Sequence, residues 1–282
     1  MTRPSPRPPS RFRILVPIWG DSYVAKFCNL GLPALLADGN LPALARDADC
    51  EVIVLTTRQS RDSIERSGAL APLARVCPYR FIAIDDLLAF DEYGTILTVA
   101  YGRGMASLGR HQQDTAFIFL NADFIFSDGL LSTVHARLQR GFRAIMAPSL
   151  RCVAEEVAAP LALRVSAATG TLSARPAELV RVALDHLHAT ARASIVNRTG
   201  RYNAVANQFF WQVDDATLLG RFFLMFMLCI QPEVPYGGAN GWCDYAFVPE
   251  MVPSGTWDVV TNSDDGFILE LQARDSEAQV LQ

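Results

Sequence analysis

Asn121 and Asp123 are the two residues whose type and spacing point most directly to chemistry. They follow the apolar run of residues 117–120 and lie two residues apart, so on an extended chain both side chains project from the same face. Hard cations such as Mg²⁺ or Mn²⁺ take oxygen ligands and commonly hold substrate phosphates as well. The pattern predicts a cation and phosphate position at Asp123; the alternative is that Asp123 only caps the next turn.

A second candidate surface follows the glycine-rich stretch of residues 237–241. Glycine allows a loop to approach a ligand closely. Trp242 and Tyr245 offer flat faces on which a sugar ring can lie, and Asp244 places a carboxylate between them. We interpret this segment as a surface that can bind a sugar; the alternative is a structural loop around a buried Trp242.

Two further acidic pairs are weaker candidates. Asp214 and Asp215 follow residues 207–211, an apolar strand or helix that we expect to enter the cleft, and a helix N-cap explains this pair equally well. Asp264 and Asp265 could complete a cation shell that Asn121 leaves short, but a solvated turn is the favoured explanation.

The spacing of apolar residues predicts the elements that position these side chains. Continuous apolar runs that end in polar residues predict buried strands at residues 13–19, 51–57, 79–85, 116–120 and 144–148. Helical segments at 23–36, 60–67 and 96–108 alternate with them, with a short helix after the turn at 39–42 and another that has Ser127 as its N-cap. This alternation predicts an α/β fold with a mainly parallel sheet, which binds ligands at the carboxyl ends of its strands.

The pattern changes after residue 150. Residues 154–193 predict helices with a break near 169–176, and residues 218–230 predict a core helix, with a membrane-facing surface as the minor alternative. The latter run is too short to span a bilayer. We expect a disordered leader at residues 1–11 and one domain over 12–282. This domain would have two halves, residues 12–150 and residues 151–282.

The composition argues against several functional classes. A net charge of -4 and a pI near 5.6 argue against nucleic-acid binding. The six cysteines form no C-x-x-C pair, so we expect them to be buried thiols of a reducing, cytoplasmic compartment, with the sequon at 197–199 a chance match.

His186 and His188 are expected on a helix surface. Residues 102–107 lack the third glycine of a dinucleotide fingerprint, and no P-loop or serine-hydrolase motif occurs.

The opening strand, Leu-Val-Pro-Ile-Trp at 15–19, and the triplet Asn121-Ala122-Asp123 resemble the GT-A glycosyltransferases, which use nucleotide sugars. The triplet is similar to the D-x-D motif of that family, and the order of elements between the two segments also fits. The resemblance implies a GT-A-like fold, a UDP- or GDP-sugar donor, and a divalent Mn²⁺ or Mg²⁺ ion on the motif. Asn121 replaces the first acid of the motif, which leaves metal dependence open.

The resemblance also implies roles for individual residues. The base and ribose would lie near Pro17, Trp19, Gly20, Thr56 and Arg58, and the cation and sugar near Asn121 and Asp123. In inverting family members a later carboxylate deprotonates the acceptor hydroxyl, and we assign this role to Asp244 with Asp215 as its rival. Trp242 and Tyr245 would bind the acceptor. Residues 12–150 would thus form the nucleotide-binding half of the domain and residues 151–282 the acceptor-side half.

The expected function is transfer of a sugar from a nucleotide donor to an acceptor that the sequence does not identify. A nucleotidyltransferase of related fold is one alternative, and the glycine-poor loop at residues 20–26 makes it less fitting. An inactive module that only binds nucleotide sugars is another, and Asn121 is the feature that favours it. Peripheral membrane contact stays open. The single lysine among many arginines is typical of a GC-rich bacterial genome.

Overall fold

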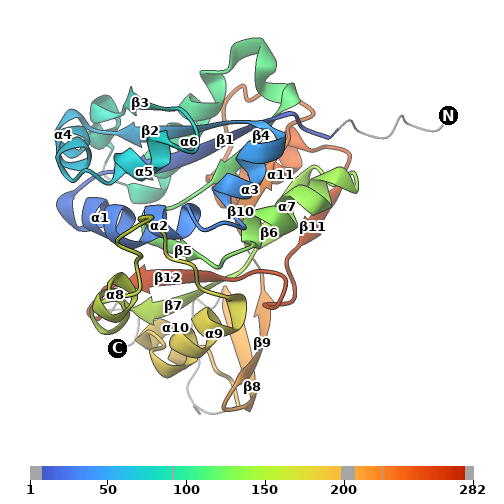
Figure 1. Ribbon diagram of the computed structural model, residues 1–282. Helices are drawn as coiled ribbons and strands as arrows, with labels where there is room; N and C mark the ends of the chain where they lie inside the picture. Colours follow the sequence, from blue (N-terminus) through green and yellow to red (C-terminus); the bar gives the residue numbers. More distant parts are fainter. Residues whose placement is uncertain (1–7, 91, 198–206, 224, 277–282) are drawn as a thin grey trace.

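A seven-stranded sheet organises the fold (Figure 1), and its strand order is β11-β6-β10-β4-β1-β2-β3. The computed structural model describes residues 8–90, 92–197, 207–223 and 225–276, with the side chain of Tyr245 also left undescribed. The strands are β1 (Arg11–Ile18), β2 (Asp49–Thr56), β3 (Tyr79–Ala83), β4 (Thr115–Phe119), β6 (Ala144–Ala147), β10 (Phe226–Ile230) and β11 (Trp257–Val259). The five strands expected from the apolar runs are confirmed, with shifted ends.

Parallel pairing places the ends of β1, β2 and β4 at one edge of the sheet. β1 pairs in parallel with both β2 and β4, and β2 pairs in parallel with β3. β10 is antiparallel to its neighbours β4 and β6, and β11 pairs in parallel with β6. The α/β fold class with a mainly parallel sheet is therefore confirmed. Because β10 and β11 come from the second half of the chain, that half completes the sheet.

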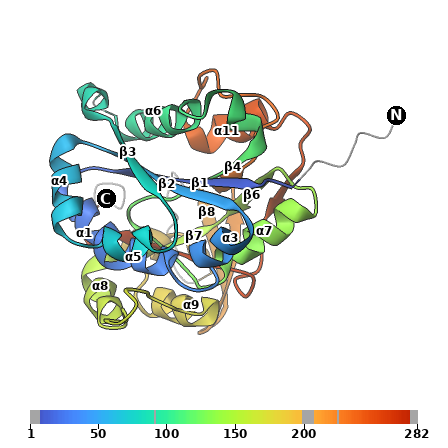
Figure 2. The same cartoon turned by 45° about the horizontal axis from the view of Figure 1, so that its top comes forward.

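Helices cover both faces of the sheet, as Figure 2 shows. One face packs against α6 (Tyr93–Ala106) and α11 (Cys243–Met251). The other packs against α1 (Asp21–Lys26), a π-helical turn at Phe27–Gly31, α2 (Leu32–Leu35), α3 (Leu41–Asp47), α4 (Arg58–Arg66), α5 (Leu70–Ala74) and α7 (Leu130–Gln139). Short 3-10 turns at Asp85–Ala89 and Gly109–Asp114 flank α6. No helix in the described residues is long and apolar enough to cross a membrane.

A smaller sheet extends the fold on the side of α1 and α2 (Figure 1). It has the order β5-β12-β7 and comprises β5 (Phe124–Phe126), β12 (Ile268–Gln272) and β7 (Ser149–Val153). Its core includes residues of α8 (Ala154–Ala162), α9 (Pro176–Asp185) and α10 (Ala189–Ala193). A hairpin of β8 (Gln208–Asp214) and β9 (Thr217–Phe222) forms a third sheet.

Three local predictions are wrong. Residues 218–230 form β9 and β10 instead of a core helix, because a short apolar run fits a buried strand as well as a buried helix. α7 begins at Leu130 after Gly129, and the Ser127 hydroxyl instead accepts a hydrogen bond from the Phe267 amide at 2.9 Å. His188 is buried at the start of α10 instead of lying on a helix surface.

Other predictions fall partly outside the described residues. The leader expected at residues 1–11 lies mostly there, and Arg11 already belongs to β1. The sequon at 197–199 also extends beyond the described part of the chain. The six cysteines are all buried free thiols, as expected.

Candidate functional site

Asp123 lies at the carboxyl edge of the central sheet, in the turn that joins β4 to β5. The preceding strand is buried throughout, and the side chain of Asp123 is itself 7% exposed. Its backbone carbonyl accepts a hydrogen bond from the Leu271 amide at 2.9 Å, which attaches this turn to β12. The fold thus delivers a carboxylate to the junction of the central and the smaller sheet.

Glu270 provides a second buried carboxylate beside Asp123. It lies in β12 opposite Phe124, the residue that follows Asp123. Its two oxygens accept hydrogen bonds from Arg151 Nε at 2.9 Å, Ser149 Oγ at 2.7 Å and Gln272 Nε2 at 2.9 Å. These three hydrogen bonds hold the Glu270 carboxyl group in place next to Asp123.

The surroundings of Asp123 favour its neutral form. Burial raises the pKa of Asp123 to about 7, and the charge of Glu270 adds to the shift, while Lys26 and Arg151 oppose it. Among the described residues, no side chain donates a hydrogen bond to the Asp123 carboxylate: Lys26 donates to the Leu271 carbonyl, and Arg151 and Ser149 donate to Glu270. A buried carboxylate with a raised pKa and no side-chain donor is suited to bind a proton or a cation.

Lys26, the single lysine of the chain, lies close to this acidic pair. Its ammonium group donates a hydrogen bond to the Leu271 carbonyl at 3.3 Å and lies 4.8 Å from the centroid of the Tyr23 ring. Burial raises the pKa of Tyr23, with further contributions from Asp123 and Glu270. α1 therefore brings a cation and an aromatic ring to the edge where β4 ends.

Asn121 is held by a buried tyrosine of α6. The hydroxyl of Tyr101 donates a hydrogen bond to Asn121 Oδ1 at 2.7 Å, and Tyr101 is completely buried. The Tyr101 ring packs edge-on against Phe119, with 4.9 Å between ring centroids. Position 121 thus lies in the predicted place, but its amide oxygen already has a partner.

The residues after β1 form an aromatic wall. Pro17 is buried within the strand, whereas Trp19 and Gly20 lie beyond its end. The rings of Trp19 and Tyr93 are 5.1 Å apart, and Tyr93 stacks on Tyr23 at 6.4 Å. Gly20 has a positive φ of 80° and precedes α1. Of the three residues at the end of β1 or just after it that are predicted to lie near the base and ribose, Trp19 and Gly20 are accessible and Pro17 is buried.

The residues predicted after β2 are placed differently from one another. Thr56 is buried, and its hydroxyl donates to the Ile18 carbonyl at 2.6 Å, so it joins β2 to β1. Arg58 begins α4 with an exposed side chain, and its amide donates to the Asp85 carboxylate at 3.2 Å. Arg58 is therefore the one of the two that solvent and ligands can reach.

Asp244 lies in the first turn of α11 with an exposed side chain. Desolvation by the surrounding protein raises the pKa of Asp244, and the charge of Glu270 adds to this shift. The neighbouring Trp242 is 46% exposed, and its indole N–H donates to Glu92 at 3.2 Å. Asp244 is thus close enough to Glu270 for the two carboxyl groups to interact electrostatically. The side chain of Tyr245 lies outside the described part of the structure.

The other acidic candidates lie apart from this group. Asp215 is in the turn between β8 and β9, in a sheet separate from the central one. Asp264 and Asp265 are in an exposed turn, and Asp265 pairs with Arg137 at 3.1 Å. The Asp265 carboxylate therefore stabilises the contact between this turn and α7.

The residues present suit a cation that keeps part of its water or phosphate shell. No group of three or more His, Cys, Asp or Glu side chains that could hold a metal occurs within the described ranges. The Glu270 oxygens are occupied by Arg151, Ser149 and Gln272, which leaves Asp123 as the available carboxylate. Mg²⁺ is commonly bound through one or two carboxylates together with water and substrate phosphates, and this donor set fits that mode.

Sequence inspection missed Glu270, Lys26 and Tyr101. Glu270 had a detectable signal, because it is the single charged residue in the apolar run of residues 267–271. A charge inside an apolar strand is rarely buried unless it has partners. Tyr101 lies within an apolar helix and carried no comparable signal.

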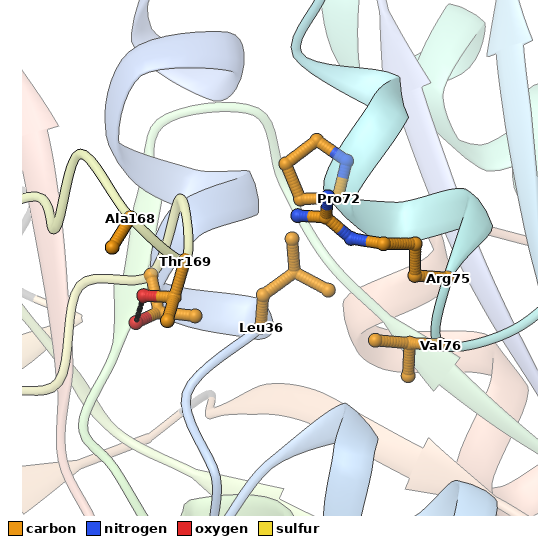
Figure 3. Close-up of a pocket in the computed structure, with 7 residues that line it drawn as sticks. Leu36, Pro72, Arg75, Val76, Ala168 and Thr169 are labelled. Carbon is orange, nitrogen blue, oxygen red and sulfur yellow. Dashed lines mark hydrogen bonds between the residues drawn. The ribbon is translucent and has the colours of Figure 1, made fainter.

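A surface pocket of about 320 Å³ lies elsewhere (Figure 3). Its lining includes Leu36 at the end of α2, Pro72 and Arg75 at α5, and Thr169. α5 ends shortly before β3 begins, so this pocket lies toward the amino ends of the strands. It is therefore separate from the edge that carries Asp123.

Comparisons with known proteins detect distant similarity in structure only. A scan of protein-family models and a search of curated proteins find no match. The chain is similar to a 4-diphosphocytidyl-2C-methyl-D-erythritol synthase from Anaerococcus prevotii, with 12% identity and a TM-score of 0.33 over 50% of this chain and 55% of that one. It is also similar to mouse xyloside xylosyltransferase 1, with 13% identity and a TM-score of 0.34 over 49% and 53%.

A third similar structure is the galactosyltransferase LgtC in complex with donor and acceptor sugar analogs, with 13% identity and a TM-score of 0.30 over 49% of this chain and 47% of that one. The matched region spans about half the length of each of these proteins. Such similarity says nothing about substrates. The α/β fold class stands on the strand order and strand directions of the chain itself.

Proposed function

We propose that this protein is a glycosyltransferase that moves a sugar from a UDP- or GDP-sugar to an acceptor, with Mn²⁺ or Mg²⁺ bound at Asp123. The observation that carries the proposal is the buried Asp123 carboxylate at the carboxyl edge of a parallel sheet. Its raised pKa and the absence of another described side-chain donor favour a bound cation. The sequence resemblance supplies the donor class.

In this proposal the residues of the chain divide between donor and acceptor. Trp19 and Gly20 border the base and ribose at the end of β1, and Arg58 does so from the start of α4. A divalent ion at Asp123 supplies positive charge that stabilises the leaving diphosphate. Trp242 presents an aromatic face to the acceptor, and Asp244 takes the proton from the acceptor hydroxyl.

One observation favours a second candidate, a module that binds nucleotide sugars without transferring the sugar. Position 121 carries a neutral amide where the D-x-D motif has an acid. Such a module would bind the donor and leave it intact. Transfer assays with the donor alone and with sugar acceptors separate the two candidates.

Calorimetry with UDP and GDP, each with and without Mn²⁺, tests the donor site. We expect tighter binding with the ion, and we expect Asp123→Asn to remove most of that gain and to lower transfer at least about a hundredfold. Asp38→Asn, the same change at an exposed carboxylate, is the matched control and should behave as wild type. Binding of neither nucleotide under any condition refutes the donor site.

A further inference from the structure

The contact between Tyr101 and Asn121 defines which groups of Asn121 can face a ligand. Tyr101 is completely buried, and its burial raises the pKa of the phenol well above the ordinary value. The phenol therefore keeps its proton and needs an acceptor inside the protein. Asn121 Oδ1, at 2.7 Å from the hydroxyl, is that acceptor.

An asparagine side chain has one carbonyl oxygen and one amide nitrogen with two protons. With the oxygen directed at Tyr101, the nitrogen is directed elsewhere. Asn121 is only partly buried, and no other described residue accepts a hydrogen bond from its amide nitrogen. The free group of Asn121 at the carboxyl edge of the sheet is thus a hydrogen-bond donor.

Charge explains why a neutral residue is favoured at this position. Asp123 and Glu270 are both buried, and Glu270 lies opposite Phe124, the residue next to Asp123. A third carboxylate at position 121 would add a like charge beside this pair, at a further electrostatic cost. The amide keeps the acceptor that Tyr101 requires and adds no charge.

We propose that Asn121 binds the donor substrate by donating a hydrogen bond from its amide nitrogen to a substrate oxygen, and that it is not a ligand of the cation. Tyr101 is the positioning residue that directs the amide. The substrate oxygen belongs either to the diphosphate or to a sugar hydroxyl. This inference rests on the proposed function, because it assumes a nucleotide-sugar donor at this edge of the sheet.

Metal binding without nucleotide tests the first half of the proposal. Mn²⁺ affinity, measured by electron paramagnetic resonance, should be the same in wild type and Asn121→Ala and should fall in Asp123→Asn. Asn121→Asp should bind Mn²⁺ more tightly, because it adds a carboxylate ligand. A loss of Mn²⁺ affinity in Asn121→Ala comparable to that in Asp123→Asn shows that Asn121 is a cation ligand and overturns the proposal.

Nucleotide binding in saturating Mn²⁺ tests the second half. We expect Asn121→Ala and Asn121→Asp to weaken binding about tenfold, the effect of one hydrogen bond to a charged or polar oxygen. A loss that already appears with UDP and GDP, which carry no sugar, identifies a diphosphate oxygen as the hydrogen-bond partner of Asn121. A loss confined to UDP-glucose or GDP-mannose identifies a sugar hydroxyl. Unchanged affinity for all four probes in both variants overturns the proposal.

Tyr101→Phe tests the positioning role, because it keeps the ring contact with Phe119 and removes only the hydroxyl. We expect a smaller loss of nucleotide affinity than in Asn121→Ala, with wild-type Mn²⁺ affinity. Asn262→Asp, in an exposed turn, is the control for added charge. If wild type binds Mn²⁺ but none of the nucleotides, the proposed function fails together with this inference; if nucleotides bind and the Asn121 variants match wild type, only this inference fails.

Discussion

Asp123 and Glu270 are two buried acidic residues that differ in their hydrogen-bond partners. Glu270 receives hydrogen bonds from Arg151, Ser149 and Gln272, which occupy both of its carboxyl oxygens. Asp123 receives no comparable donors from the described side chains and has the raised pKa. Of the two carboxylates, Asp123 is therefore the one that gains most from a bound proton or cation.

The raised pKa of Asp123 predicts an unusual pH dependence of stability. Its pKa is about 7 in the folded protein against an ordinary value of 3.8. Between these values the folded state binds more protons than the unfolded chain, so the free energy of unfolding of the cation-free protein falls as pH rises from about 4 to about 7. Asp123→Asn should remove this fall and have a higher Tm than wild type at about pH 8.

Differential scanning fluorimetry in EDTA, from about pH 5 to about pH 8, measures this difference. Added Mn²⁺ should raise the wild-type Tm at the alkaline end, where Asp123 is ionised, and have little effect on Asp123→Asn. Parallel Tm profiles for the two proteins in EDTA would contradict the shifted pKa.

Asp244 and Asp215 are separated by their surroundings, and turnover can distinguish them. Asp244 shares the electrostatic field of Glu270, whereas Asp215 lies in the hairpin turn. If Asp244 is the general base, Asp244→Asn should lower turnover about 10² to 10⁴ fold with nearly unchanged nucleotide affinity. Steady-state kinetics of Asp244→Asn and Asp215→Asn give the answer. If only the Asp215 variant loses turnover, Asp215 is the general base and Asp244 is not.

The sequence was informative where local pattern and position agree. Asp123 was predicted from its place after an apolar strand, and the strand is present. Glu270 could not be paired with Asp123 in advance, because β5 and β12 meet only through the tertiary fold, far apart along the chain. The structural role of Thr56 could not be predicted either, since its hydroxyl donates a hydrogen bond to the Ile18 carbonyl of the neighbouring strand β1.

α6 connects the part of the candidate site that contains Asn121 to the start of α11, which carries Asp244. Its Tyr101 contacts Asn121 after β4, and its Thr98 accepts a hydrogen bond from the Cys243 amide at 2.9 Å, at the start of α11. Gly102 of the same helix leaves the space that Tyr236 occupies, since a Cβ there would lie 2.3 Å from the Tyr236 ring. One helix therefore sets the position of Asn121 relative to Asp244.

Thr98 offers a test of this connection, because the residue is buried. Thr98→Val keeps the shape of the side chain but leaves the Cys243 amide without its acceptor, which should cost about 1 to 3 kcal/mol of stability. Thr98→Ser keeps the hydroxyl and is the matched control. Urea unfolding measures the stability, and acceptor KM should rise in the valine variant. Equal stability of the two variants contradicts the role of this hydrogen bond.

The strands of the first half were easier to predict than those of the second. β1 and β2 are continuous apolar runs bounded by polar turns, and neighbours in sequence become neighbours in the sheet. β10 was predicted as part of a helix because its apolar residues gain strand geometry only from pairing with β4 and β6. Local periodicity contains no information about such a partner.

The whole sheet depends on β10, because this strand separates β4 from β6 in the strand order. A chain that ends at Phe223 lacks β10, β11 and β12 and leaves facing edges of β4 and β6 unpaired. We expect it to show no cooperative thermal transition by near-ultraviolet circular dichroism. A chain that ends at Ser276 keeps every described strand and should unfold as the full chain does. A cooperative transition in the shorter chain would show that the first half folds by itself.

The late position of β10 in the chain also affects how the protein is made. During translation, β4 and β6 leave the ribosome roughly 80 to 110 residues before the strand that joins them, at about 5 to 20 residues per second. Over those seconds the nascent chain exposes two apolar strand edges that can pair with other chains. Cells that produce this protein quickly would therefore accumulate aggregates unless chaperones protect the growing chain, and slower synthesis at low temperature should raise the yield of native protein.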